Sequence, residues 1–414
     1  MSLPYLQAFG WHADVLTVEA RSVGTTYDPL LATSLPERLN VIRAQALPVR
    51  LTRLVGVQGL AWRALWSLYR QGHKALKENA YDLVFFSTTV FPVIALGRLW
   101  QRRFGVPYVV DFQDPWQTDY YDGPHAPRPP GGRFKFRASQ LFARVVEPAV
   151  MRKAAGFISV SVAYSETLLQ RYGWLRSVPT RVLPFAGSER DFEITVEQGV
   201  TQSIFDAADG KTHWVYAGVA GAVMAYALRG FFHALRAARA EDPDRYRSLV
   251  IHFIGTDYAP GKRSRNSVQS LAEEFEVGDL VTEHSLRIPY FEALRCLLDA
   301  DALVVPGSDD PAYTASKIYP YLLARKPLLA IFHEESPVVD VVRSTSTANV
   351  VTFRPGESLE ALSKAILKRW FSRSGPTPAH LRADAFSKYT AREMTRVLCL
   401  YFDDVLAREG AAPP

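Results

Sequence analysis

Short apolar runs alternate with longer helical patterns along nearly the whole sequence. Parallel strands need a crossover of a dozen or more residues between them, and the helical patterns are long enough to supply it. The alternation therefore predicts parallel α/β sheets. The expected strands are 14–18, 82–87, 108–111, 156–160 and 181–184 in the first half, and 213–217, 249–255, 280–284, 302–305, 328–332 and 349–351 in the second.

A chain of 414 residues is too long for one hydrophobic core and fits two α/β domains. The segment 192–211 is polar and weakly patterned, so we expect a linker there. It divides the sequence into a first domain over 1–191 and a second over 212–385. Residues 386–414 follow the last predicted strand and carry an amphipathic helix.

The two cysteines, Cys296 and Cys399, lie in apolar helical patterns. Buried thiols of a cytosolic protein fit that placement, whereas a disulfide framework or a zinc site does not. The most apolar run, 83–96, is too short to span a bilayer. We therefore expect a cytoplasmic protein with no metal, in contact with a membrane at its periphery if at all.

Positive charge is concentrated in the first half. Residues 1–200 hold 23 Lys+Arg against 16 Asp+Glu, and residues 201–414 hold 25 against 26. A basic first domain suits an anionic membrane surface or an anionic acceptor. No nucleic-acid-binding motif accompanies it, so we expect no nucleic acid. Residues 51–77 interleave cations with Trp62 and Trp66, which fits a membrane-interface helix and equally a helix that covers a sheet.

The first residues depart from the expected order. Residues 3–9 form a helical pattern that ends at Gly10, and the strand 14–18 follows. A doubly wound domain should open with a strand and a Gly-rich turn before that helix, and this first strand is central in the sheet. Either the sequence starts downstream of the true start, which we favour, or the domain is built without its middle strand.

A hydroxyl-rich loop leads from the strand 302–305 into a predicted helix over 317–325. Thr314 and Ser316 offer N-cap hydroxyls, and Lys317 lies in the first turn. Backbone N–H groups and an ammonium group would converge there, an arrangement suited to a diphosphate. A solvated surface lysine is the alternative for Lys317.

Two predicted strands of the first half end in polar residues, at the edge where open α/β sheets bind ligands. The strand 108–111 delivers Asp111 and Asp114, with Trp116 close behind. The strand 82–87 opens into Ser87 and Thr88. The carboxylates and hydroxyls could equally cap the following turns, with Trp116 packed beneath them.

The second domain opens with Trp214-Val-Tyr-Ala-Gly-Val-Ala-Gly221, a strand followed by two glycines. Gly218 lets the backbone approach a ligand closely. Arg229 lies further along, in the next helical pattern, where it could contact phosphate or remain a solvated charge.

The segments 108–116 and 312–330 resemble parts of GT-B fold glycosyltransferases of the family-4 type. The resemblance covers about residues 3–390 and implies two Rossmann-like domains facing a cleft, with the C-terminal helix crossing back to the first. It implies a retaining transferase that moves a hexose from a nucleotide diphosphate sugar to a glycan or lipid-linked acceptor, without a further cofactor.

The resemblance also implies roles for particular residues. The residues that would bind the donor phosphates are Gly218, Arg229, Thr314, Ser316 and Lys317. Catalytic candidates are Asp111 and Asp114, and substrate-binding candidates are Trp116, Ser87, Thr88 and Asp310. Glu147 matches a glutamate common in the family, with a surface salt bridge as its alternative. Loop residues His125, Lys262, Arg263 and Arg265 are weaker candidates.

Two departures from the family pattern bear on activity. The arginine expected just after the first glycine is missing, since Val219 or Ala220 stands there. The family usually carries two glutamates eight positions apart in the segment that corresponds to 312–330. Their positions are occupied here by Ala312 and Pro320, and a proline side chain cannot accept a hydrogen bond from a ribose hydroxyl. A non-enzymatic GT-B scaffold, or another nucleotide-sugar enzyme such as a 2-epimerase, therefore remains open.

Overall fold

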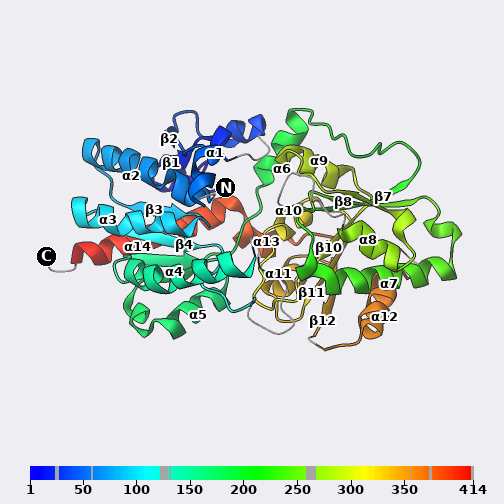
Figure 1. The fold of residues 1–414 in the computed structure, drawn as a ribbon. Coiled ribbons are helices and arrows are strands. Elements are labelled where there is room, and N and C mark those ends of the chain that lie inside the picture. Colours follow the sequence, from blue (N-terminus) through cyan, green and yellow to red (C-terminus); the bar gives the residue numbers. More distant parts are fainter. Residues whose placement is uncertain are drawn as a thin grey trace. The chain divides into compact units, whose positions relative to one another are not determined.

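The computed structural model describes residues 1–23, 28–56, 59–121, 129, 132–257, 267–354, 356–372 and 375–411. Internal contacts divide the chain into two compact units (Figure 1). Unit 1 comprises residues 1–27, 35–184 and 392–414, and unit 2 comprises residues 28–34 and 185–391.

Unit 1 contains parallel strands in two separate sheets. The larger sheet has the order β3-β4-β5-β6, and the smaller is the pair β1-β2. Strand β2 was not expected from the sequence. The strands are β1 (Asp14–Val18), β2 (Asn40–Ala44), β3 (Val84–Ser87), β4 (Tyr108–Phe112), β5 (Gly156–Ser159) and β6 (Thr180–Val182).

The helices of unit 1 are shorter than the sequence indicated near the N-terminus. The pattern over 3–9 forms only the 3₁₀ turn Leu6–Phe9, with no buried residue, and the pattern over 51–79 is divided at Gly56 and Gly59. The α-helices are α1 (Val49–Thr52), α2 (Leu60–Glu78), α3 (Ala95–Phe104), α4 (Arg133–Met151), α5 (Val162–Arg171) and α14 (Ala391–Ala411), with further 3₁₀ turns at Ala20–Ser22, Arg53–Val55, Phe91–Ile94 and Gly173–Ser177.

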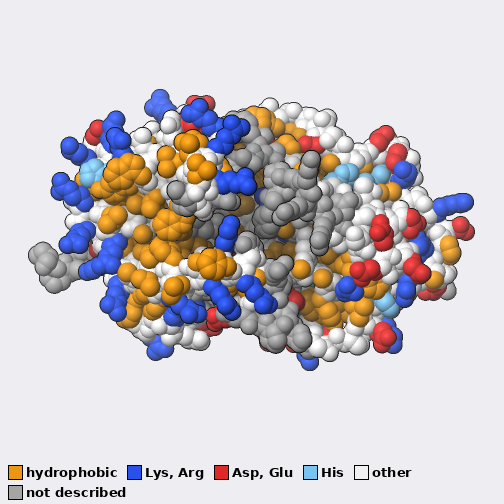
Figure 2. Space-filling model, viewed as in Figure 1, with side chains coloured by type: hydrophobic (Ala, Val, Ile, Leu, Met, Phe, Trp, Pro, Cys, Tyr) orange, Lys and Arg blue, Asp and Glu red, His pale blue; other side chains and the backbone are white. Residues whose placement is uncertain are grey.

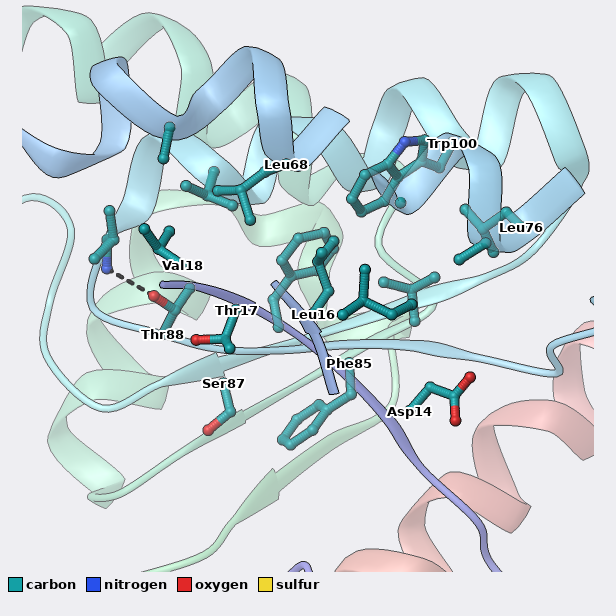
Figure 3. Close-up of a pocket in the computed structure, with 18 of the residues that line it drawn as sticks. Asp14, Leu16, Thr17, Val18, Leu68, Leu76, Phe85, Ser87, Thr88 and Trp100 are labelled. Atoms are coloured by element: carbon teal, nitrogen blue, oxygen red, sulfur yellow. Dashed lines mark hydrogen bonds between the residues drawn. The ribbon is translucent and has the colours of Figure 1, made fainter. Parts of the chain in front are cut away.

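A cavity of about 370 Å³ lies between the two sheets of unit 1. Figure 3 shows Leu16 of β1 and Phe85 of β3 along it, with Leu68 and Trp100 on the helices that cover it. Among the described residues β1 pairs only with β2, and β3 only with β4. Among the described residues no strand lies between β1 and β3, and the cavity lies between these two strands.

Unit 2 is a single six-stranded parallel sheet with the order β12-β11-β10-β7-β8-β9. The order reverses between β7 and β10, as in a doubly wound Rossmann-like domain. The strands are β7 (Thr212–Ala217), β8 (Leu249–Ile254), β9 (Val281–His284), β10 (Ala302–Pro306), β11 (Leu328–His333) and β12 (Asn349–Phe353).

Helices accompany these strands, and their apolar faces form the core of unit 2 with the sheet. In the core Gly230 of α7 lies against Leu362 of α12. The α-helices are α6 (Glu189–Glu197), α7 (Ala225–Glu241), α8 (Ser267–Glu274), α9 (Tyr290–Asp299), α10 (Ile318–Leu323), α11 (Pro337–Thr345), α12 (Leu359–Trp370) and α13 (Ala383–Phe386), with 3₁₀ turns at Pro29–Ser34, Ala222–Met224, Asp244–Tyr246, Gly278–Leu280 and Ser387–Tyr389.

The expected linker over 192–211 is part of unit 2 and contains most of α6. Ser188 caps this helix by accepting a hydrogen bond from the Asp191 N–H, and Ile194 is buried. The interpretation as a linker was wrong because one short helix with few apolar residues gives too weak a periodicity to detect.

A short segment of the first half also belongs to unit 2. The carboxylate of Asp28 accepts hydrogen bonds from the N–H groups of Phe291, in the first turn of α9, and of Leu30. An acidic side chain at this position satisfies an N–H group that has no partner within the helix.

Helix α14 packs on the sheet of unit 1. The hydroxyl of Tyr401 contacts the carbonyl oxygens of Phe157 and Pro179, at 3.1 and 2.9 Å, and Trp11 Nε1 donates to Asp403. Close approach requires a glycine on the strand, because a Cβ at Gly156 would lie 2.2 Å from the Tyr401 hydroxyl oxygen.

We expect Gly156→Ala to destabilise unit 1 by about 1–3 kcal/mol, the usual cost of adding a methyl group to a packed core. Thermal unfolding by circular dichroism measures it. Gly173→Ala is the matched control in the same unit, since a Cβ at Gly173 has no atom within 4 Å. Equal melting temperatures for the two variants would contradict the close docking of α14.

Candidate functional site

The strand order of unit 2 reverses between β7 and β10, and these two strands separate early. They pair only at Ala302 with Trp214 and at Leu303 with Val215. The last residues of β7 continue to pair with β8 on the other side, up to Ala217 with Ile254. The two strands therefore diverge at their carboxyl ends, the edge where open α/β sheets bind ligands.

A tyrosine from α10 takes the place of the missing strand pairing. The hydroxyl of Tyr321 accepts a hydrogen bond from the Ala217 N–H, at 2.6 Å, and donates to the Ala217 carbonyl oxygen at 3.2 Å. Tyr321 is buried. These two bonds satisfy backbone groups that β10 no longer reaches and fix α10 against the end of β7.

Lys317 lies over the first glycine of the turn that follows β7. A Cβ at Gly218 would lie 2.7 Å from Lys317 Nζ and 3.1 Å from its Cε. Gly218 also has φ +147°, a backbone conformation that side chains disfavour. The structure thus brings together two of the predicted donor-site residues, which are about a hundred positions apart in the sequence.

The ammonium group of Lys317 has polar and aromatic neighbours. It donates to the hydroxyl of Tyr216, lies 4.6 Å from the centre of that ring, and is 3.5 Å from the Val219 carbonyl oxygen. Burial, with a smaller contribution from the charge of Arg287, lowers the pKa of Lys317 to about 7. The free site therefore holds a lysine that loses its proton near neutral pH, and an anion placed there would favour the charged form.

The loop before α10 is held by its own side chains. Ser308 Oγ accepts from the Asp310 N–H, and Asp310 accepts from the Ala312 N–H at 2.9 Å. Burial raises the pKa of Asp310. In this structure the Asp310 carboxylate thus organises the loop.

The prediction that Thr314 and Ser316 cap the helix with their hydroxyl groups was wrong. Helix α10 starts at Ile318, its N-cap residue is Lys317, and no side chain caps it. Thr314 Oγ1 contacts the Ala312 carbonyl oxygen and Ser316 is exposed. The reason is the entry turn, in which the Ile318 N–H bonds to the Ala315 carbonyl oxygen and the helix starts two residues after Ser316.

Arg229 is not brought to Lys317 by any described contact. It lies on α7 and pairs with Glu274 of α8 at 3.1 Å, with both side chains about half exposed. A solvated helix charge, the alternative given by the sequence, describes this arrangement.

In unit 1 the end of β4 carries a small polar network. Asp111 is 7% exposed and accepts hydrogen bonds from Ser87 Oγ at 3.0 Å and from Gln113 Nε2 at 2.8 Å. Burial raises the pKa of Asp111, and the two hydrogen bonds oppose that rise. Ser87 and Asp111 occupy paired positions on β3 and β4, so the predicted strand ends do lie side by side.

The remaining candidates of unit 1 have separate environments. Asp114 is exposed, and partial desolvation raises its pKa. Trp116 is only 5% exposed and stacks on Phe91 at 5.4 Å, so its observed role is packing. Thr88 accepts from the Val90 N–H, which caps the turn, and lines the cavity of unit 1 together with Ser87 (Figure 3).

Glu147 is fully buried, not at the surface. Its Oε1 contacts Arg171 Nη1 at 3.0 Å, Gln117 Nε2 at 2.7 Å and the Tyr172 hydroxyl at 3.0 Å. Burial raises the pKa of Glu147, and Arg171 is the main opposing influence. This network ties α4 and α5 to the loop after β4.

Several candidates lie outside the described residues, namely His125, Lys262, Arg263 and Arg265. Within the described ranges no group of three or more His, Cys, Asp or Glu side chains could hold a metal ion. None of the helices in those ranges combines the length and apolar character needed to cross a membrane.

Sequence reasoning missed Tyr216, Tyr321 and Gln113. Tyr216 and Tyr321 read as core aromatics at strand and helix spacing, and both rings are indeed buried. Their hydroxyl groups make hydrogen bonds at the site, and the Tyr216 ring also lies under the Lys317 ammonium group. Spacing alone does not reveal this, although buried tyrosines usually find a hydrogen-bond partner.

Comparison with known proteins agrees with this architecture. Residues 3–186 match the family described as "Glycosyl transferase 4-like domain". In sequence, no curated protein matches the chain. Solved structures are similar in fold over almost the whole chain, at low identity.

Three of these structures illustrate the similarity. Sucrose-phosphate synthase from Thermosynechococcus elongatus has a TM-score of 0.54 at 16% identity, covering 99% of this chain and 90% of its own. An α,α-trehalose-phosphate synthase (UDP-forming) from Burkholderia vietnamiensis has a TM-score of 0.53 at 14% identity, covering 97% of this chain and 100% of its own. HepE from Anabaena, in complex with UDP and glucose, has a TM-score of 0.51 at 14% identity, covering 97% of this chain and 98% of its own.

The two Rossmann-like units, the matched domain and these neighbours define the GT-B fold. The chain as a whole has the GT-B fold, and its residues 3–186 match a glycosyl transferase 4-like domain.

We expect Gly218→Ala to displace the Lys317 ammonium group and to lower affinity for nucleotide diphosphates by about tenfold or more, the loss of roughly one charged hydrogen bond. Isothermal titration calorimetry measures it. Gly221→Ala is the control on the same turn, because a Cβ there has no atom within 4 Å. Equal affinities for both variants would show that nucleotide binding does not require the absence of a side chain at position 218.

Proposed function

We propose that this protein is a glycosyltransferase that moves a hexose from a nucleotide diphosphate sugar to a glycan or lipid-linked acceptor, with retention of anomeric configuration. The observation that carries the proposal is Lys317 over Gly218, where β7 and β10 diverge. Retention rests on the family resemblance alone.

The chemistry around Lys317 suits a diphosphate. An anion bound beside Lys317 would favour the charged form of this lysine, and the glycine at position 218 leaves space for the lysine side chain next to the backbone. Stabilising a departing diphosphate in this way is electrostatic catalysis, which requires no nucleophile or metal from the protein. Because solved neighbours are described as UDP-forming or UDP-bound, UDP is the first nucleotide to test.

The acceptor side of the proposal rests on the end of β4. Asp111 is buried and oriented by Ser87 and Gln113, so its carboxylate can hold an acceptor hydroxyl in a fixed direction. Positioning of this kind supplies much of the rate in group transfer. Polysaccharide biosynthesis in the cytoplasm, with contact at a membrane surface, completes the proposal.

We expect Lys317→Ala to lower the affinity for UDP by about 10–100-fold at neutral pH, as for the loss of a hydrogen bond to a charged group. Wild-type affinity should fall by up to about tenfold for each pH unit above 7, since the free lysine deprotonates there. The variant should lack this slope. Calorimetry with UDP, GDP and ADP from about pH 7 to 9 measures both effects.

Lys326→Ala, on the turn that enters β11, is the control and should keep both affinity and slope. If no nucleotide binds the cooperatively folded protein, the chain is a GT-B scaffold without a donor site. If a nucleotide sugar binds and is isomerised or hydrolysed without any acceptor, the 2-epimerase class replaces the transferase.

We expect Asp111→Asn to reduce sugar transfer by about 100-fold or more, while UDP affinity changes by less than about twofold. The nucleotide-release rate under saturating donor and acceptor measures transfer. Asp82→Asn, an exposed aspartate just before β3, is the control. Unchanged transfer by Asp111→Asn would leave this carboxylate with a structural role only.

A further inference from the structure

Helix α4 has an apolar stripe on its exposed side. Phe134, Ala138, Leu141 and Val145 are all exposed and follow one another at spacings of four, three and four residues. Phe134 is 87% exposed and Val145 67%. Spacings of three and four place these side chains on one face of the helix, the face turned away from the core of unit 1.

Helix α2 has an exposed face of the same kind. Trp62 and Trp66 lie four residues apart, and Trp66 is 68% exposed. Arg70 and Lys74 continue the same face, also exposed. The opposite face of α2 packs inward through Ala64 and Leu68, so the tryptophans are not needed for the core.

The two apolar faces belong to one surface. The Trp62 ring contacts the Phe142 ring of α4 edge to face, with centroids 5.0 Å apart. Figure 2 shows a broad apolar area over α2, α3 and α4, with Lys and Arg side chains around its rim. We name Trp62, Trp66, Phe134, Leu141 and Val145 the α2–α4 surface.

Within helices α2 and α4, which the structure describes, the exposed charges beside the apolar residues are mostly positive. The acidic residues of α2 and α4 are Glu78, in the last position of α2, and Glu147, which is buried and bound to Arg171. Exposed cations of these two helices therefore flank the apolar residues, with no carboxylate of either helix between them. These cations are Arg70, Lys74, Arg133, Lys135, Arg137 and Arg144.

We propose that the α2–α4 surface docks on an anionic lipid bilayer, with the tryptophans and aliphatic side chains in the headgroup region and the cations on lipid phosphates. Exposed apolar stripes with Trp and flanking Arg and Lys are the features of helices that lie in a membrane interface. Each cation near an anionic surface adds to the electrostatic attraction, so six together attract the surface strongly.

The charge distribution favours this occupant over the others. A second copy of the chain would bring the same cations against each other, which opposes a symmetric dimer through this surface. Nucleic acid would match the charge but would leave Phe134, Leu141 and Val145 in water. A bilayer satisfies both the charge and the apolar area.

Co-sedimentation of the full chain with vesicles tests the proposal, without any sugar or nucleotide. We expect binding to phosphatidylcholine vesicles that contain phosphatidylglycerol, weaker binding to phosphatidylcholine alone, and loss of binding as salt is raised. Arg137→Glu with Arg144→Glu should lower the partition coefficient by at least about tenfold. Phe134→Ser with Leu141→Ser should lower it by a similar factor on anionic vesicles.

Matched controls come from other exposed surfaces. Lys368→Glu with Arg369→Glu, on α12 of unit 2, and Leu286→Ser, 62% exposed, should bind vesicles as the wild type does. Brominated lipid should quench less tryptophan fluorescence in Trp66→Phe than in the wild type. All of these positions are exposed, so unchanged melting temperatures separate binding effects from folding effects.

The proposal is overturned if the wild type does not bind anionic vesicles. It is also overturned if the variants of the α2–α4 surface and its flanking cations bind these vesicles as well as the controls do. A concentration-dependent dimer that Leu141→Ser dissociates, without vesicle binding, would assign the surface to a second copy. Binding to duplex DNA that competes with the vesicles and survives Phe134→Ser with Leu141→Ser would assign it to nucleic acid. Lys317→Ala should bind vesicles normally, so this result stands apart from the proposed transfer reaction.

Discussion

The candidate donor site depends on the separation of two parallel strands. Strands β7 and β10 share only two paired positions, so backbone groups at the end of β7 need another partner. Tyr321 supplies it through both bonds of its hydroxyl to Ala217. Because Tyr321 lies on α10, the same bonds fix the residue just before that helix, Lys317, over Gly218. Loss of the hydroxyl would release the position of the lysine together with the strand end.

Helix α10 has a proline where the family pattern has a glutamate, and the position of this proline explains why the helix tolerates it. Pro320 is the third residue of α10, in the first turn, where N–H groups have no partner within the helix. The proline therefore costs little for folding. The acidic side chains nearest in sequence, Asp309 and Asp310, both make contacts within the loop. Asp310 accepts from the Ala312 N–H, and Asp309 Oδ1 accepts from Ser308 Oγ at 3.5 Å. A ribose contact, if made by this loop, would have to displace existing hydrogen bonds.

Strand positions followed from the sequence because buried parallel strands read as short apolar runs. Strand β2 escaped notice because its exposed and half-buried residues give no continuous run. The N-cap hydroxyls failed since caps depend on where a helix begins, which periodicity places only within a few residues. Contacts such as Lys317 with Tyr216 cannot be read from spacing, because they join residues a hundred positions apart.

The docking of α14 on β5 has a consequence for how the chain is made. The sheet of unit 1 is complete once Pro184 has left the ribosome, yet the helix that covers it begins more than two hundred residues later. At 5–20 residues per second the nascent sheet waits about 10–40 s for that cover. Unit 2 is synthesised meanwhile, so the domain that starts first finishes last. During this interval the apolar partners of Tyr401 and Phe402 face water or a chaperone.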